Sequence, residues 1–255
     1  MTVKLPELAT FNAARAAEWR PGVTSEETPH GEVFAATHEG SGAAFALALA
    51  IDWLRSAAAD PQADVLADKP DERAWLWVQD RAALNKTGRP YRPGLPRALR
   101  HRLIHVAANK PEDALFAMEE GLRCRDLAFV IGEVAGNPKA LSFTASRRLS
   151  LATQRHGVPL WLVRLDAVRD LSSARMRWQA EAAPSPPPRW NAQAPGPASW
   201  RAGLFRARNH PPGEWIMRDE ANRLVTDTIA VGSASTAPNS RDLVGAVRPR
   251  SLAAH

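Results

Sequence analysis

Residues Gly31–Ala50 read GEVFAATHEGSGAAFALALA, and this stretch decides the fold. It opens with the short apolar run Val33–Ala36, which predicts a buried β-strand. A turn rich in Gly and Ser follows over residues 37–42, and an apolar segment that predicts a helix begins at Ala43. A strand, a glycine-rich turn and a helix in this order are typical of an anion-binding loop, because backbone N–H groups at the start of a helix attract negative charge.

The same stretch departs from the phosphate-loop pattern G-x-x-x-x-G-K-[ST] at the residues that supply its charge chemistry. In register, Thr37 takes the first Gly, whereas Ala43 and Ala44 stand where the Lys and the Ser or Thr are required. Because phosphoryl transfer depends on positioned charge, we predict no catalytic residue here. A vestigial nucleotide-binding site that uses backbone groups is one interpretation, and a turn that only joins strand to helix is the other. The candidate residues of the vestigial site are Gly40, Ser41 and Gly42.

Further apolar runs alternate with helical segments along the chain. These runs are residues 74–78, 103–107, 126–133 and 159–165. Such alternation predicts a mostly parallel sheet that helices cover on both faces. Residues 174–181 then alternate between apolar and polar, which predicts a half-exposed strand, and further strands are expected at 200–208 and 214–218. The expected fold class is α/β, with an antiparallel C-terminal extension of the sheet.

Composition divides the chain into three parts. Residues 1–30 are predicted to be an N-terminal arm and connector, and residues 31–231 a core domain with a Pro-rich insertion at 184–197. Residues 232–255 are small and polar, so we expect a disordered tail. The one cysteine, Cys124, is expected to be a packed thiol and forms no internal disulfide, which favours a reducing, cytoplasmic location. No apolar run approaches the ~20 residues that span a bilayer, so we expect no membrane partner.

The net charge of +6 favours nucleic acid or an acidic protein as a partner. Arg81–Lys110 holds eight Lys and Arg and no Asp or Glu, and Pro and Gly predict irregular structure over residues 81–102. A basic surface for DNA or a protein is one interpretation, and a solvated loop is the other. The candidate contacts are Arg81, Lys86, Arg89, Arg92, Arg97, Arg100 and Arg102. A second acid-free stretch, Pro138–Gly157, includes Arg147, Arg148 and Arg155, and a solvated helix face explains it most simply.

Aromatic and histidine residues are less informative. Nine Trp occur in the chain, and those in predicted strands are expected to pack in the core. Trp190, Trp200 and Trp215 instead flank the Pro-rich insertion, and they are candidate partner anchors because interface hot spots favour Trp and Arg. Seven His are scattered without the paired spacing of metal ligands, so no metal site is predicted.

Taken together, the order and spacing of these segments resemble the RecA-like core, and most closely its ImuA branch, whose phosphate loop is degenerate. The resemblance covers about residues 31–181 and runs more loosely to 225. It is carried by the segments AWLWVQD, RLIHVAANKPEDALFAMEEGLRCRDLAFVIGE and RRLSLATQRHGVPLWLVRL. In such cores the Walker B Asp falls where Gly132 stands, and the γ-phosphate-sensing Gln falls near Arg164. Glu133 lies one position later and is expected to face the opposite side of the sheet.

The resemblance implies an accessory protein of damage-induced translesion DNA synthesis, that is, of DNA repair by error-prone mutagenesis in the SOS response. ImuA-type proteins act with an ImuB-type, Y-family-polymerase-like protein and with an error-prone replicative-type polymerase. RecA and DNA are further candidate partners, and no cofactor is implied beyond weakly bound ATP. One alternative is an ATPase with unusual ligands, in which Arg164 or an Arg of another subunit replaces the missing Lys. Another is a RecA-like inhibitor of a filament, similar to SulA-type division inhibitors.

Overall fold

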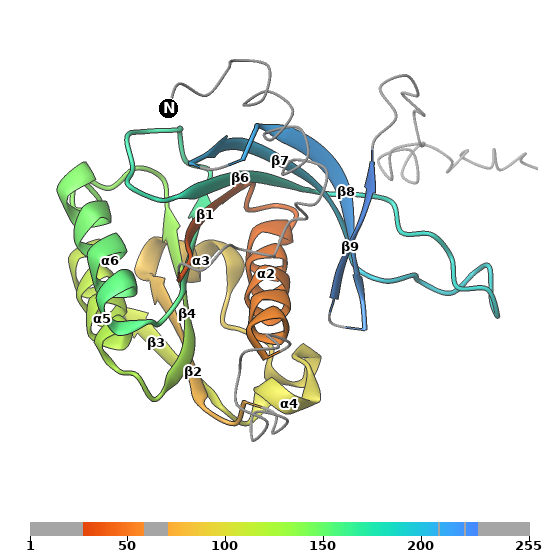
Figure 1. Cartoon of the computed structure of the whole chain (residues 1–255), viewed down its shortest axis with the longest axis horizontal. Helices are drawn as coiled ribbons and strands as arrows, with labels where there is room; N and C mark the ends of the chain where they lie inside the picture. Colours follow the sequence, from red (N-terminus) through yellow and green to blue (C-terminus); the bar gives the residue numbers. More distant parts are fainter. Residues whose placement is uncertain (1–27, 59–70, 209, 222, 229–255) are drawn as a thin grey trace, which may run out of the picture.

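A single mixed β-sheet forms the centre of the protein in the computed structural model, which describes residues 28–58, 71–208, 210–221 and 223–228. Its nine strands lie in the order β3-β2-β4-β5-β1-β6-β7-β8-β9 (Figure 1). Neighbouring strands are parallel from β3 to β6 and antiparallel from β6 to β9. The strands are β1 (His30–Ala35), β2 (Ala74–Asp80), β3 (Leu103–Ala108), β4 (Leu127–Ala135), β5 (Leu160–Leu165), β6 (Met176–Ala182), β7 (Ser199–Ala207), β8 (Gly213–Glu220) and β9 (Arg223–Thr228). The predicted α/β class, a mostly parallel sheet with an antiparallel C-terminal extension, is confirmed.

Helices cover both faces of this sheet. The described helices are α2 (Ser41–Ala58), α3 (Arg81–Thr87), α4 (Arg97–Arg100), α5 (Pro111–Arg123) and α6 (Phe143–His156), with a 3₁₀ helix η2 (Arg92–Gly94). Helices α5 and α6 pack on one face, and α2 lies on the other (Figure 1). Local sequence sets the ends of α6, because Ser142 accepts a hydrogen bond from the N–H of Ala145 and Gly157 adopts the left-handed conformation that ends many helices.

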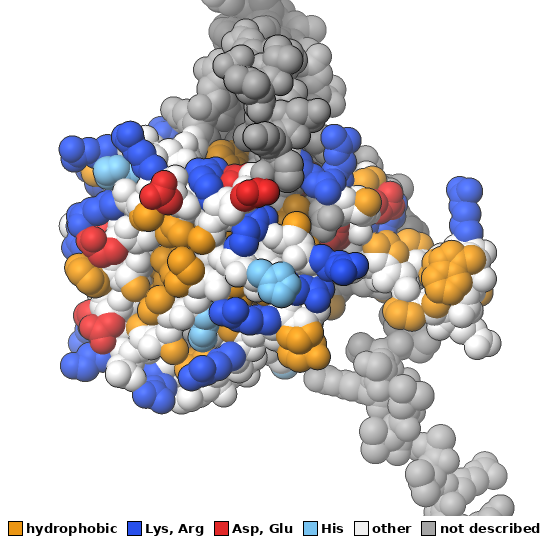
Figure 2. Space-filling model, turned by 90° about the horizontal axis from the view of Figure 1, so that it is seen from below, with side chains coloured by type: hydrophobic (Ala, Val, Ile, Leu, Met, Phe, Trp, Pro, Cys, Tyr) orange, Lys and Arg blue, Asp and Glu red, His pale blue; other side chains and the backbone are white. Residues whose placement is uncertain are grey.

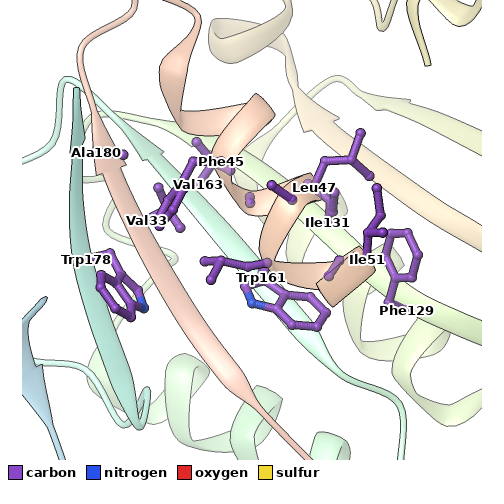
Figure 3. Close-up of a cluster of buried hydrophobic side chains, with 14 of the residues drawn as sticks. Val33, Phe45, Leu47, Ile51, Phe129, Ile131, Trp161, Val163, Trp178 and Ala180 are labelled. Carbon is purple, nitrogen blue, oxygen red and sulfur yellow. The ribbon is translucent and has the colours of Figure 1, made fainter. Parts of the chain in front are cut away.

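The apolar face of α2 packs on the middle of the sheet. Figure 3 shows Phe45, Leu47 and Ile51 beside strand residues that include Trp161 and Trp178. The Phe45 ring meets the Trp178 ring edge-on, with their centroids 5.8 Å apart. This cluster fixes the start of α2 against β1 and β5, which positions the loop between β1 and α2.

The opposite face of the sheet has a second core, under α5 and α6. A side chain at Gly132 would place its Cβ 2.2 Å from the Met118 sulfur of α5, and one at Gly121 would place it 2.4 Å from Leu76 Cδ2. Both contacts are shorter than real Cβ contacts, so a side chain at either position would force Met118 or Leu76 to move. Gly132, at the place of the Walker B Asp in the resemblance, is thus explained by the packing of α5.

The expectation of irregular structure over residues 81–102 is wrong. Helix α3 begins directly after β2, where the Asp80 carboxylate accepts a hydrogen bond of 2.7 Å from the N–H of Ala83. Leu95 and Leu99 are buried and belong to the core cluster on the α2 side of the sheet. The basic segment is therefore a folded part of the protein.

Two further features of the structure differ from what the sequence predicts. Strand β9 was not predicted; it is anchored by α2, where Asp52 Oδ1 accepts a hydrogen bond of 3.1 Å from the N–H of Leu224. Cys124 is exposed at the end of α5, so the prediction of a packed thiol is wrong. Residues 1–27 of the predicted arm and the predicted tail, 232–255, lie outside the described residues. In the described part of the chain, no helix is both long enough and apolar enough to cross a membrane.

Candidate functional site

The loop between β1 and α2 is bound to a carboxylate of the same chain. Asp166, directly after β5, accepts hydrogen bonds from the backbone N–H of Thr37 (3.0 Å) and from its hydroxyl (2.9 Å). Lys86 of α3 reaches the same carboxylate, with its Nζ 2.8 Å from Asp166 Oδ2. The hydrogen bond from Lys86 and those from Thr37 lower the pKa of Asp166 to about 2. A negative charge from the protein thus lies against Thr37 of the loop.

The rest of the loop is attached to β6. Glu39 accepts a hydrogen bond of 2.8 Å from the N–H of Ala182, and the buried hydroxyl of Ser41 lies 3.3 Å from the carbonyl oxygen of Ala180. The Ser41 hydroxyl also lies 3.5 Å from the Glu39 carboxylate. These contacts connect the Glu39 side chain of the turn and Ser41, the first residue of α2, to the end of β6.

Glycine is favoured for structural reasons at one position of the loop and at the start of α2. Gly40 has a φ of +63°, which residues with a Cβ rarely adopt. At Gly42 a Cβ would lie 2.7 Å from the Ala35 Cβ and 2.9 Å from Val163 Cγ1, so α2 approaches the sheet closely there. Turn geometry, packing and hydrogen bonding therefore account for all three predicted nucleotide-binding residues, Gly40, Ser41 and Gly42.

A cation from a distant part of the chain lies near this loop. The sequence predicts Lys86 as a surface contact for a partner. In the structure its ammonium group pairs with Asp166, the carboxylate that also binds Thr37 of the loop. Arg164 does not take this place. Its guanidinium is buried on the other face of the sheet, 5.4 Å from the Phe34 ring centroid and hydrogen-bonded to Asp170. The expectation that Arg164 replaces the missing Lys near Ala43 is wrong.

Glu133 is a buried carboxyl group near the same end of the sheet. It accepts hydrogen bonds from Gln79 Nε2 (2.6 Å) and from the hydroxyl of Thr87 (3.2 Å), whereas Gly132 faces α5, so the two residues face opposite sides as predicted. Burial, together with the charge of Asp80, raises the pKa of Glu133. Among the described residues, no three His, Cys, Asp or Glu side chains are grouped so that they could hold a metal ion.

No family model and no curated protein sequence matches the chain. The candidate site therefore depends on the geometry described above and on the resemblance in the order of its segments.

Three of the seven predicted basic contacts donate to backbone carbonyl groups, and the first of them, Arg92, donates to that of Leu103 at 3.0 Å. Arg102 donates to the carbonyl oxygens of Ala98 (2.7 Å) and Arg73 (2.9 Å), and also to that of Asp71. Arg100 donates to the carbonyl oxygen of Leu95 at 3.1 Å. Because these guanidinium groups are engaged with the backbone, their first role is structural.

Five of the seven predicted basic contacts, Arg92 among them, have exposed side chains. They are Arg81, Lys86, Arg89, Arg92 and Arg97. On the face shown in Figure 2, Lys and Arg side chains are more frequent than Asp and Glu, and they are spread over the surface instead of forming one strip.

The three predicted tryptophan anchors lie in different environments. Trp200 is only 4% exposed, and its ring centroid lies 5.7 Å from that of Phe45, so it is a core residue; its prediction as a surface anchor is corrected. Trp215 is half-buried against Trp178, with ring centroids 6.0 Å apart. Trp190 is 81% exposed. Only Trp190 offers most of its indole surface to a partner.

Trp190 lies in the Pro-rich connection between β6 and β7, which projects from the body of the protein (Figure 1). At its base, the N–H of Ala183 donates to the carbonyl oxygen of Ser199 at 3.1 Å, and the Ser185 hydroxyl donates to that of Pro197. The two halves of this connection, residues 183–198, therefore run side by side. We call it the Trp190 arm.

A buried ionic cluster, which no sequence motif indicates, lies on the sheet face opposite α2. Glu32 of β1 is fully buried and accepts hydrogen bonds from Arg177 Nε (2.7 Å) and from the Ser172 hydroxyl (2.6 Å). Arg177 also donates to the backbone oxygen of Asp170 at 2.7 Å. Arg164 donates to the Asp170 carboxylate as well. Burial alone would raise the pKa of Asp170, but the hydrogen bonds and charge of Arg164 outweigh it, so the pKa is lowered. The cluster fixes the segment between β5 and β6 on the sheet.

Proposed function

We propose that this protein is a non-catalytic accessory factor of translesion DNA synthesis that acts mainly through protein–protein contacts. The observation that carries the non-catalytic part is the Thr37–Asp166–Lys86 contact. The Asp166 carboxylate accepts the hydrogen bonds of the Thr37 N–H and the Lys86 ammonium group. A bound phosphate would need both of these donors. Ala43 and Ala44 supply neither the charge nor the hydroxyl of an active phosphate loop.

The assignment to translesion synthesis depends on the resemblance to the ImuA family. The partners that it implies are an ImuB-type protein and an error-prone replicative-type polymerase, with RecA and DNA as further candidates. The sheet order and the degenerate loop are compatible with this proposal. The Trp190 arm supports contact with a protein, because an exposed Trp next to Arg189 has the composition of an interface hot spot.

The first test measures nucleotide binding by calorimetry with ATP and with ADP, each with Mg²⁺. We expect no binding at millimolar nucleotide. One specific observation favours the competing function, an ATPase with unusual ligands: Lys86 places a cation at the loop. Micromolar, Mg²⁺-dependent binding and turnover that Lys86→Ala abolishes would therefore overturn the non-catalytic assignment.

The second test is a pull-down of purified ImuB-type protein and polymerase by the full chain and by Trp190→Ala. Loss of a hot-spot Trp costs about 2 kcal/mol or more, so the variant should bind about 30-fold more weakly. Phe116→Ala is the matched control, since Phe116 is an exposed aromatic residue on α5, away from the arm. Equal binding by the three proteins would remove the arm from the proposal. Binding to a division protein and to neither of the polymerase-type partners would favour the filament inhibitor.

A further inference from the structure

An arginine-lined cleft of about 600 Å³ lies between α6 and the neighbouring ends of β6 and β7. Arg147 comes from α6, Arg175 immediately precedes β6, and Arg206 and Arg208 lie at the end of β7. Among the described residues that line the cleft there is no Asp or Glu. The cleft is at the amino end of β6, whereas the loop site is at the carboxyl ends of the parallel strands.

The sequence builds one wall of the cleft from a single helix face. Phe143, Arg147 and Leu151 are four residues apart, so they lie on the same side of α6. The next residue, Arg148, instead forms an ion pair with Glu119 of α5. Two adjacent arginines thus have different surroundings, one in the cleft and one against the neighbouring helix.

Strand pairing builds the other wall. Because side chains alternate along a strand, Arg206 and Arg208 of the β7 end share one side of the sheet. The N–H of Arg208 donates to the carbonyl oxygen of Arg175 at 3.1 Å, which holds these two residues together. Burial and the nearby charge of Arg208 lower the pKa of Arg175, as expected for guanidinium groups of like charge in one cleft.

This arrangement suits a ligand with several phosphates. Arginine presents a planar set of donors that match phosphate oxygens in pairs, and a bound anion reduces the repulsion between like charges. The cleft also has two exposed apolar side chains, since Phe143 is 49% exposed and Leu151 is 53% exposed. An exposed aromatic ring beside arginines is how proteins bind unpaired bases, because a base stacks on the ring while its phosphate meets a cation.

We propose that this cleft binds the phosphate backbone of single-stranded nucleic acid, with Phe143 as a stacking surface for a base. The inference goes beyond the proposed function and does not depend on it. Nucleic-acid binding at the cleft would stand even if the ImuB-type and polymerase partners were refuted.

The test compares the full chain with two double variants of equal net charge. Arg147→Ala/Arg206→Ala removes two exposed cleft arginines, and Arg148→Ala/Arg155→Ala removes two exposed arginines of α6 that do not line the cleft. Fluorescence anisotropy measures the binding of a labelled oligothymidylate over a range of salt concentrations. Each lost phosphate contact lowers the salt slope by about 0.7, so the cleft variant should lose about 1.4 in slope and about tenfold in affinity near 0.15 M salt. The control should keep the wild-type slope.

Single aromatic substitutions test the stacking role of Phe143. Phe143→Ala should weaken binding at least about fivefold without a change in salt slope, and Phe116→Ala should not weaken it. Matching circular dichroism and melting temperatures would show that all variants are folded. Equal losses in both double variants would overturn the cleft as the site. Binding of inorganic tripolyphosphate without binding of the oligonucleotide would overturn nucleic acid as its ligand.

Discussion

Replacing Arg177 by Met is expected to destabilise the protein severely, because it leaves the fully buried Glu32 without its main cation. The change removes the 2.7 Å hydrogen bond to Glu32 and the 2.7 Å bond to the backbone of Asp170. Arg164 cannot compensate fully, since its Nη1 is 3.8 Å from Glu32 and its guanidinium is bound to Asp170. Removal of one partner of a buried ion pair costs about 3–5 kcal/mol, and we expect a loss in this range.

Urea unfolding followed by tryptophan fluorescence measures this loss as a change in the free energy of unfolding. The control is Arg201→Met, since Arg201 and Glu214 form an exposed ion pair at 3.7 Å whose loss should cost less than about 1 kcal/mol. Adding Glu32→Gln to Arg177→Met removes the stranded charge and should recover part of the stability. A loss below about 1 kcal/mol for Arg177→Met would refute the reasoning, because Glu32 would then not depend on this arginine.

Three smaller predictions concern other parts of the protein. Burial lowers the pKa of His30 to about 4, so the unfolded chain gains a proton more readily as pH falls from 6.5 to 4. The native state should lose about 3 kcal/mol over that window, and His30→Gln should remove this part of the pH dependence of unfolding. Gly42→Ala should lower the free energy of unfolding by about 1–3 kcal/mol through overpacking against Ala35, whereas an unchanged urea midpoint would contradict the close approach of α2. Cys124 should react with a thiol reagent in the native protein, and a reaction that occurs only after denaturation would show that it is buried.

The sheet was predictable because its central strands are buried on both faces and therefore consist of continuous apolar residues. The runs at β2, β4 and β5 are of this kind. Helices α3 and α4 were missed because seven and four residues are too few to show a helical period, and the Pro and Gly between them indicated loops. Strand β9 was missed because its sequence, RLVTDT, is largely polar, and its place depends on an edge supplied by β8 and α2.

The site was less predictable than the fold because its contacts join distant parts of the chain. Lys86 and Thr37 meet at Asp166, a residue that no motif marked. Glu32 and Arg177 are 145 positions apart. Glu32 directly precedes the predicted apolar strand, and Arg177 is a polar position of the alternating segment 174–181, so neither indicates its partner. Trp200 was predicted as a surface anchor because the Pro-rich insertion precedes it, yet its strand places it in the core.

The loop site and the arginine-lined cleft lie at opposite ends of the parallel strands, and they differ in how favourable anion binding would be. At the loop site, an incoming phosphate would need to displace Asp166 from Thr37 and Lys86, and it would gain no new cation from Ala43 or Ala44. At the arginine-lined cleft, an anion would bind guanidinium groups of like charge and would reduce their mutual repulsion. The balance of gains and losses therefore favours the cleft, so anion binding in this fold is expected away from the position at which phosphate loops bind nucleotides.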